Sequence, residues 1–188
     1  MNIIIGGVGG QGLVLSTKIM SEAAFDAGFD VKTNDVIGLS QRVGRIWGSV
    51  KYGDKIYSPN ISEGEADILI TFEPLEAQRY LHMLKPEGGI VIVNTFEMAP
   101  MYVQQGAMAY PDDIYDTLKE KAQVIALDAT HEATKLGNVA VTNILMLGIA
   151  ADKMDIKKEI WLRAIEKNVP EKFIQLNLKA FEMGYNYK

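Results

Sequence analysis

Residues 2–12 read Asn-Ile-Ile-Ile-Gly-Gly-Val-Gly-Gly-Gln-Gly, and this stretch decides the fold. Its apolar beginning predicts a short strand, and residues 13–24 continue with apolar side chains at helical spacing. A glycine-rich turn between a strand and a helix can accept a phosphate, because main-chain N–H groups at the helix N-terminus point at the anion. We therefore predict the first corner of a Rossmann-like α/β domain.

The turn satisfies the pattern G-x-G-x-x-G, whose glycines have separate roles. Gly7 is expected to permit the tight turn, Gly9 to let the backbone approach a phosphate, and Gly12 to allow close packing of strand and helix. A dinucleotide site also needs an acid at the end of the second strand, but residues 31–34 end without one and Asp35 comes one residue late. A phosphate or cofactor contact and a purely structural turn both remain open, and NAD is the minor case.

The rest of the chain alternates strand-like and helix-like segments. Expected strands are 29–33, 67–72, 89–94 and 123–127; expected helices are 74–84, 112–121 and most of the chain after about 139, with a break at 168–170. Residues 34–44 read as a polar loop, and residues 45–52 and 55–57 as a hairpin around Gly53-Asp54. The prediction is a mostly parallel, doubly wound sheet with an inserted β-hairpin and a helical C-terminal region, forming one domain over residues 1–188.

Composition excludes several classes of function. A chain of 188 residues with 48% hydrophobic content can bury one sizeable core. Cysteine is absent and there are two histidines, so we expect no disulfide, no iron–sulfur cluster held by this chain and no metal site. A net charge of −5 argues against a nucleic-acid partner, and nothing resembles a signal peptide or membrane span. We expect a cytoplasmic protein with small-molecule or protein partners.

Two further segments carry candidate binding residues. The loop from Gly38 to Arg45 contains Arg42, whose guanidinium can form two hydrogen bonds to a carboxylate or phosphate. The competing interpretation is a solvated loop whose arginines pair with nearby acids. Glu73 lies at the end of an expected strand, where open α/β sheets place ligands, whereas Glu76 is expected to cap the next helix. No catalytic pair can be assigned from spacing.

Together these blocks resemble the beta subunits of indolepyruvate ferredoxin oxidoreductase, which are related to the gamma subunits of other 2-oxoacid:ferredoxin oxidoreductases. The resemblance covers essentially the whole chain. Its segments are Gly7–Gly12, Gly38–Arg42, Ser58-Pro59, Gly64–Asp67, Phe72–Ala77, Leu84–Pro86, Val93–Thr95, Gly137-Asn138, Asn143, Leu147-Gly148 and Asn177. Ile37 and Val43 depart from the family pattern, which often has histidine and glycine there.

The resemblance implies a subunit of an enzyme that oxidatively decarboxylates arylpyruvates with coenzyme A and reduces ferredoxin. Thiamine diphosphate and iron–sulfur clusters would belong to a partner alpha subunit, since this chain lacks cysteine and the Gly-Asp-Gly opening of a thiamine-diphosphate motif. This chain would be a non-redox subunit that completes the complex, with a contact to coenzyme A left open. The candidate cofactor-binding residues are Gly7, Gly9, Gly10, Gln11, Gly12, Gly38, Ser40, Gln41, Arg42 and Glu73. Two alternatives are a free-standing NAD(P)- or FMN-binding oxidoreductase and a purely structural assembly subunit.

Overall fold

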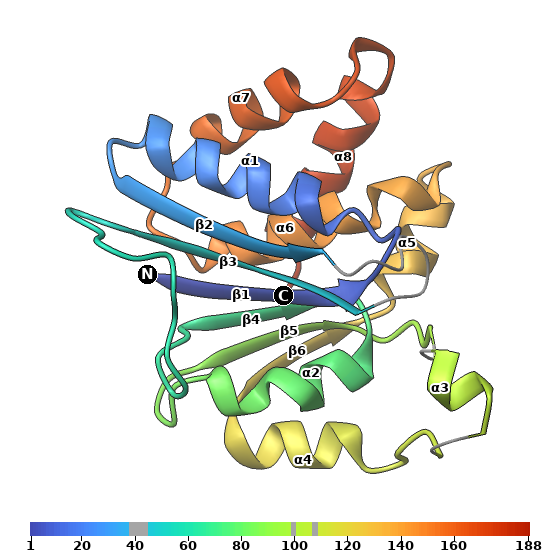
Figure 1. Cartoon of the computed structure of the whole chain (residues 1–188). Helices are drawn as coiled ribbons and strands as arrows, with labels where there is room; N and C mark the ends of the chain where they lie inside the picture. The colour runs from blue at the N-terminus through green and yellow to red at the C-terminus, as the bar shows by residue number, and fades with distance from the viewer. Residues whose placement is uncertain (38–44, 99–100, 107–108) are drawn as a thin grey trace.

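A six-stranded sheet separates two layers of helices in the computed structural model, which describes residues 1–37, 45–98, 101–106 and 109–188 (Figure 1). The strand order is β2-β3-β1-β4-β5-β6. The strands are β1 (Asn2–Val8), β2 (Asp30–Ile37), β3 (Arg45–Gly53), β4 (Ile68–Thr71), β5 (Ile90–Asn94) and β6 (Gln123–Leu127). The α-helices are α1 (Leu13–Asp26), α2 (Pro74–Tyr80), α3 (Met101–Gln104), α4 (Ile114–Lys121), α5 (Ala129–Lys135), α6 (Thr142–Asp152), α7 (Lys158–Asn168) and α8 (Ile174–Tyr185). Short 3-10 helices are η1 (Leu81–Met83), η2 (Val139–Val141) and η3 (Glu171–Phe173).

Strands β1, β4, β5 and β6 form the parallel part of the sheet. Side chains alternate between its faces, so Ile3 and Ile5 pack into the core on one side while Ile4 packs into the core on the other. All four residues of β4 are buried. Helices cover both faces, which explains why these strands are continuous apolar runs rather than alternating ones. The predicted strands at 67–72 and 89–94 are confirmed, and both lie inside the sheet.

The helices divide between the two faces of the sheet. Helices α1, α6, α7 and α8 lie on one face, and α2 and α4 lie on the other (Figure 1). Helix α6 is the most buried, because every residue from Asn143 to Ala151 is shielded from solvent. The predicted helical C-terminal region therefore forms, together with α1, one of the two covering layers.

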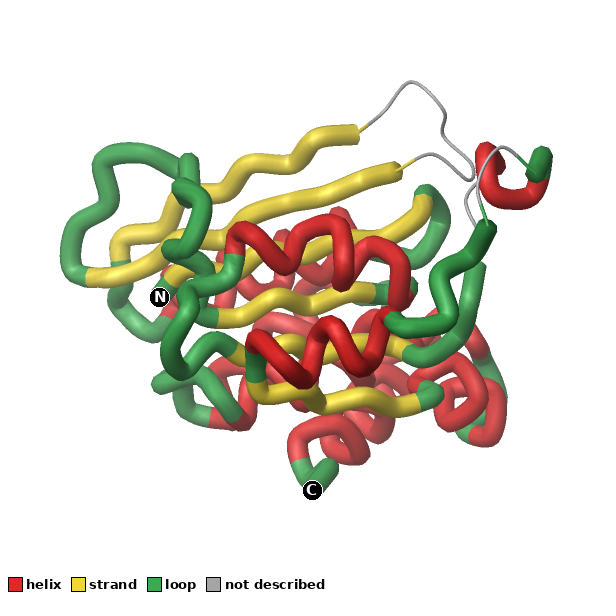
Figure 2. Tube along the Cα trace, turned by 90° about the horizontal axis from the view of Figure 1, so that it is seen from below, coloured by secondary structure: helices red, strands yellow, loops and turns green. Residues whose placement is uncertain are grey.

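Two expectations for the antiparallel part of the sheet are wrong. The sequence suggested that residues 45–52 pair with residues 55–57, but β3 pairs antiparallel with both β2 and β1, and residues 55–57 form no strand. Strand β2 also continues to Ile37, through residues that were read as loop, because its ladder with β3 runs that far. The hairpin is thus formed by β2 and β3, which are connected by residues 38–44. Strand β3 therefore lies between β2 and β1 in the sheet. Figure 2, seen from the side of α2 and α4, shows that neither helix extends over β2 and β3.

Helices α6 and α8 approach closely where glycine faces glycine. A Cβ atom built on Gly148 would collide with the main-chain oxygen of Phe181, and one built on Gly184 with that of Leu145. Because the obstacles are main-chain atoms rather than movable side-chain ends, the crossing requires glycine on both helices.

Candidate functional site

The glycine-rich corner forms where β1 ends at Val8 and α1 begins at Leu13. Gly10 (φ 99°) and Gly12 (φ 82°) have left-handed backbone conformations, which residues other than glycine rarely adopt. Gly12 is the N-cap of α1, and the first helical bond runs from the Ser16 N–H to the Gly12 oxygen. The main-chain N–H groups of residues 13–15 therefore have no acceptor within the helix.

Gly7 has a different role from the one predicted. It lies inside β1 rather than in the turn, because the strand continues three residues beyond Ile5, to Val8. A Cβ atom on Gly7 would lie 2.9 Å from Gln11 Oε1 and 3.1 Å from Phe72 Cδ2, so glycine is needed for side-chain packing. The tight turn itself is made by the glycines that follow, and Gly9 lies half-buried within it.

Gln11 fixes the turn to the neighbouring strand. Its Oε1 accepts a hydrogen bond from the Val8 N–H at 2.7 Å, and its Nε2 donates to the Phe72 oxygen at 3.0 Å. Phe72 directly follows β4, so the side chain ties the ends of β1 and β4 together. These hydrogen bonds hold the turn in place, and a contact of Gln11 to a cofactor stays a prediction.

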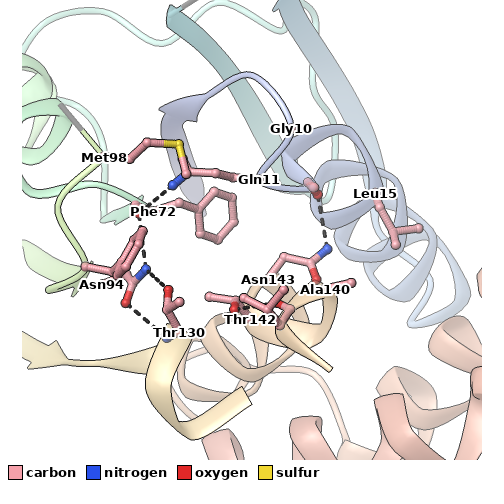
Figure 3. A pocket seen from close by; sticks show the side chains of 13 residues that line it. Gly10, Gln11, Leu15, Phe72, Asn94, Met98, Thr130, Ala140, Thr142 and Asn143 are labelled. Carbon is pink, nitrogen blue, oxygen red and sulfur yellow. Dashed lines mark hydrogen bonds between the residues drawn. The ribbon is translucent and has the colours of Figure 1, made fainter. Parts of the chain in front are cut away.

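A cavity of about 470 Å³ opens beside this corner, at the carboxyl ends of β1, β4 and β5 (Figure 3). This is the edge at which open α/β sheets bind ligands. The lining residues are Gly10, Gln11, Gly12, Leu15, Phe72, Asn94, Phe96, Met98, Thr130, Val139, Ala140, Thr142 and Asn143. Among these described residues none carries a charge.

Asn94 holds the far wall of the cavity. Its Nδ2 donates to the Phe72 oxygen at 3.2 Å and to Thr130 Oγ1 at 2.9 Å, while its Oδ1 accepts from the Ala129 N–H at 3.0 Å. The side chain is 1% exposed. Because its amide bonds to the ends of both β4 and α5, Asn94 keeps this wall rigid.

Asn143 closes the cavity from α6. Its Nδ2 donates to the Gly12 oxygen at 3.1 Å, which links α6 to the start of α1. A Cβ atom on Gly12 would lie 2.6 Å from this same nitrogen. The Asn143 Oδ1 is buried, and the described part of the chain offers it no hydrogen-bond partner.

The candidate binding residues fall into three groups. Gly10, Gln11 and Gly12 line the cavity, whereas Gly7 and Gly9 belong to the same corner but do not line it. Gly38, Ser40, Gln41 and Arg42 lie outside the described residues. Their connection nevertheless begins and ends at this edge, because Arg45, where β3 starts, pairs with Val8 at the carboxyl end of β1.

Glu73 lies away from the cavity, on the face covered by α2. It is fully buried and is the N-cap of that helix: one carboxylate oxygen accepts from the Glu76 N–H at 3.2 Å, and the other accepts from the Tyr110 hydroxyl at 2.6 Å. The capping role expected for Glu76 thus belongs to Glu73. Glu76 instead lies in the first turn of the helix, where its buried carboxylate pairs with the Arg79 Nε at 3.2 Å.

Burial raises the pKa of both Glu73 and Glu76 above the ordinary value of 4.5, although Tyr110 lowers the first and Arg79 the second in part. Between the ordinary and the raised pKa the folded chain binds more protons than the unfolded chain. These two groups therefore make the free energy of unfolding fall as pH rises through that window.

We expect the variant Glu76→Gln to remove part of this pH dependence. Its free energy of unfolding relative to the unmodified chain should increase as pH rises from about 4.5 to 8, by about 1.4 kcal/mol for each unit of raised pKa. Urea titrations across that pH range measure it.

Glu22→Gln is the control, for which the expected change has the opposite sign. Burial of Glu22 opposes ionisation, but hydrogen bonds from Asn168 and Lys167 outweigh it and lower the pKa, so this variant should lose relative stability as pH rises. Parallel curves for Glu76→Gln and the unmodified chain would contradict the assignment.

Asp35 does not occupy the position of a ribose-binding acid. Strand β3 lies between β1 and β2, so the end of β2 is one strand farther from the glycine corner than a dinucleotide site requires. The Asp35 carboxylate accepts instead from Thr17 Oγ1 on α1 at 3.2 Å. This geometry weighs against NAD at the corner.

Several cavity residues were not singled out from the sequence as binding residues. Phe72, Asn94 and Asn143 appeared there only as parts of family-like segments, and Thr130 and Thr142 carried no signal of their own. Within the part of the chain that the structure describes, no group of three or more His, Cys, Asp or Glu could hold a metal ion. Over the same residues, no helix is long and apolar enough to cross a membrane.

Comparison with known proteins gives matches over nearly the whole chain. The sequence profile of the family described as pyruvate ferredoxin/flavodoxin oxidoreductase matches residues 2–187. The indolepyruvate oxidoreductase subunit IorB of Archaeoglobus fulgidus is 38% identical, over 99% of this chain and 94% of that protein. The crystal structure of the keto/oxoacid ferredoxin oxidoreductase gamma subunit from Geobacter sulfurreducens has a TM-score of 0.73 and 28% identity, over 98% of this chain and 95% of that one.

A larger protein contains the same fold as one part of its chain. The 2-oxoglutarate:ferredoxin oxidoreductase from Magnetococcus marinus, solved with 2-oxoglutarate, coenzyme A and succinyl-CoA bound, superposes with a TM-score of 0.78 at 18% identity. The match covers 98% of this chain but 30% of that one. At this identity the likeness shows the fold alone.

Proposed function

Because this chain belongs to the pyruvate ferredoxin/flavodoxin oxidoreductase family and is a subunit of a 2-oxoacid:ferredoxin oxidoreductase, we propose that it is the non-redox subunit of an enzyme acting on indolepyruvate. The observation that carries the proposal is the match to an indolepyruvate oxidoreductase subunit over nearly the full length of both chains. The resemblance first seen in the sequence is confirmed at the level of the family.

The partner in this proposal is an alpha subunit that carries thiamine diphosphate and the iron–sulfur clusters. The cysteine-free sequence supports that division, because clusters are held by cysteine thiolates. Thiamine diphosphate supplies the electron sink for decarboxylation. This chain would then contribute the edge of the sheet that carries the cavity, the glycine corner and the β2–β3 hairpin.

We place a contact to coenzyme A at that same edge. Main-chain N–H groups at the start of α1 can face a phosphate, and the β2–β3 connection that contains Gly38, Ser40, Gln41 and Arg42 starts and ends beside them. Glu73 does not enter this proposal, because Tyr110 and α2 already occupy its carboxylate. A free-standing NAD(P) enzyme is disfavoured by the strand that separates β2 from β1.

The test is to purify this chain alone and together with its partner subunit, and to assay both with coenzyme A, ferredoxin and a panel of 2-oxoacids. We expect no turnover by the chain alone and the highest kcat/KM for an arylpyruvate in the complex. In that complex, Arg42→Ala should lower kcat/KM for coenzyme A more than about tenfold, since a lost charge-assisted contact costs about 1.4 kcal/mol or more. Turnover without the partner would refute the division of labour, and unchanged kinetics for Arg42→Ala would remove that residue from the site.

A further inference from the structure

Strand β2 is an outer edge of the sheet, and in the described part of the chain no strand pairs with its free side. It pairs with β3 at every position from Asp30 to Ile37, so the strand contains no bulge, and its sequence contains no proline. Bulges and prolines are two of the features that keep an edge strand from pairing with another strand. This regular edge is therefore able to accept a further strand.

The register shows which main-chain groups lie along the free side. Tyr52 on β3 bonds to Met1 through both its N–H and its oxygen, so its bonding groups face β1. Since bonding groups alternate in direction along a strand, those of Lys51 face β2, where Lys32 is its partner. The outward N–H and C=O groups of β2 include those of Val31, Thr33 and Asp35.

An open groove runs beside this free edge, on the face of the sheet that α1 covers. Its lining residues come from β2, α1 and α7 and are Ser21, Glu22, Phe25, Val31, Thr33 and Lys167. Phe25 is 70% exposed. A single exposed phenylalanine is common on protein surfaces, but this one lies next to a strand that can accept a partner. The groove and the free edge form one surface, because Val31 and Thr33 belong to both.

The side of α1 that carries Glu22 and Phe25 is complementary to itself when the helix is paired with an antiparallel copy. Val14, Lys18, Glu22 and Phe25 follow one another at intervals of three or four residues, which places them along one side of the helix. Val14 is 44% exposed, and Lys18 is also exposed. In an antiparallel pair, Lys18 of each copy meets Glu22 of the other. Val14 of each copy likewise meets Phe25 of the other.

Contacts between α1 and β2 place both features on a common axis. Thr17 Oγ1 on α1 donates to the Asp35 carboxylate at 3.2 Å. Toward the other end of the helix, the Ala24 oxygen accepts from the Phe29 N–H at 3.1 Å. Residues midway between Thr17 and Ala24 therefore lie beside the middle of β2, near Thr33. A two-fold axis perpendicular to the sheet at this point brings α1 and β2 each against its own copy in antiparallel orientation.

An antiparallel pair centred on Thr33 also satisfies the strand. The outward groups of Thr33 bond to those of its copy, while Lys32 lies opposite Asn34 and Val31 opposite Asp35, so no like charges are opposed there. Because α1 packs on both β2 and β3, its axis is about one strand spacing, about 5 Å, from the new centre line. The two copies of α1 would then be about 10 Å apart, a normal distance for packed helices.

We propose that β2 and α1 form the surface through which two copies of this chain associate, with the sheet continuing across a two-fold axis. A symmetric dimer uses the same patch on both copies, so complementarity of the patch to itself favours a second copy over an unrelated protein. Helix α7 lies on the side of α1 away from the sheet (Figure 1). The surface shares no lining residue with the cavity at the carboxyl edge, and the inference does not depend on the proposed function.

Sedimentation velocity of the full chain measures the association, and a pair of charge variants gives the sharpest test. Lys18→Glu and Glu22→Lys should each weaken the dimer more than about tenfold, because each places like charges across the axis. Mixed in equal amounts, the two variants should associate again, because the mixed pair joins two acids to two bases. A change confined to one chain cannot produce recovery on mixing. A mixture that stays monomeric while the unmodified chain dimerises would contradict the α1 contact.

Thr33→Pro tests the strand pairing separately. Proline removes an N–H that points away from β3, so the ladder with β3 is kept while the pair with the second copy is broken. Circular dichroism checks that the fold is retained, and the dimer should weaken about tenfold or more. Phe25→Ala should also weaken it, whereas Phe173→Ala, another partly exposed phenylalanine outside this surface, should leave it unchanged.

Cross-linking locates the contact. Because the chain contains no cysteine, Thr33→Cys introduces a single thiol, and a short bis-maleimide should join two copies through it. Thr134→Cys is the matched control, since Thr134 is exposed on α5, which follows β6 at the opposite edge of the sheet. An unmodified chain that sediments as a monomer at every concentration overturns the inference. Equal cross-linking at the two positions does the same.

Discussion

Replacing Gly148 by alanine is expected to lower the free energy of unfolding by about 3 kcal/mol, at the upper end of the cost of overpacking a core. The new methyl group would collide with the Phe181 oxygen on α8 and lie 2.8 Å from the Tyr185 nitrogen. These are main-chain atoms, so neither can rotate away and α6 and α8 must separate. Helix α6 packs on β4 and β5 and α8 packs on α6, so the separation disturbs this whole layer, and the expected fall in Tm is roughly 6–12 °C for a chain of this size.

Urea unfolding followed by far-UV circular dichroism measures the change, and Gly53→Ala provides the control. A Cβ atom on Gly53, at the end of β3, would meet only Ile56 Cδ1 at 3.5 Å, an ordinary contact, so its effect should stay below about 1 kcal/mol in either direction. Equal effects of the two substitutions would show that the helix crossing is looser than the structure indicates.

The sequence was sufficient for β4 and β5 because these two strands are buried on both faces. The apolar runs that became β4 and β5 have the length of strands rather than of helices, and β6 was predicted with its observed bounds at Gln123–Leu127. The antiparallel part was misread because pairing is a property of two segments. Gly53-Asp54 is a favourable hairpin dipeptide and predicted that β3 pairs with the residues after it. Strand β3 pairs instead with β2, which comes before β3 in the sequence.

The same distinction applies to the candidate site. Gly10, Gln11 and Gly12 were found because a local motif places them between a strand and a helix. Asn143 bonds to Gly12 across 131 residues of sequence, and Asn94 meets Thr130 across 36, so no local pattern could place them beside the corner. The expected role of Gly7 was wrong for a local reason, since β1 runs on through Gly6 and Gly7 where glycine predicted its end.

Gly12→Ala is expected to cost about 3 kcal/mol of folding free energy, because it combines two separate penalties. A left-handed backbone costs a non-glycine residue about 1–2 kcal/mol. The added methyl would also lie 2.6 Å from Asn143 Nδ2, which crowds the link between α1 and α6. Chemical denaturation of the variant measures the sum.

Gly10→Ala separates the two penalties. Gly10 has a similar left-handed conformation, but no described atom within 4 Å would meet its Cβ, so alanine there should cost only the backbone term of about 1–2 kcal/mol. In an Asn143→Ala background, the cost of Gly12→Ala should fall toward that of Gly10→Ala, giving a coupling energy of about 1–2 kcal/mol. A cycle with no coupling would mean that Asn143 does not press on the corner, and the cavity wall between α1 and α6 would then be free to move. A strong coupling would establish that residues 131 positions apart hold the edge of the sheet at which we place the ligand.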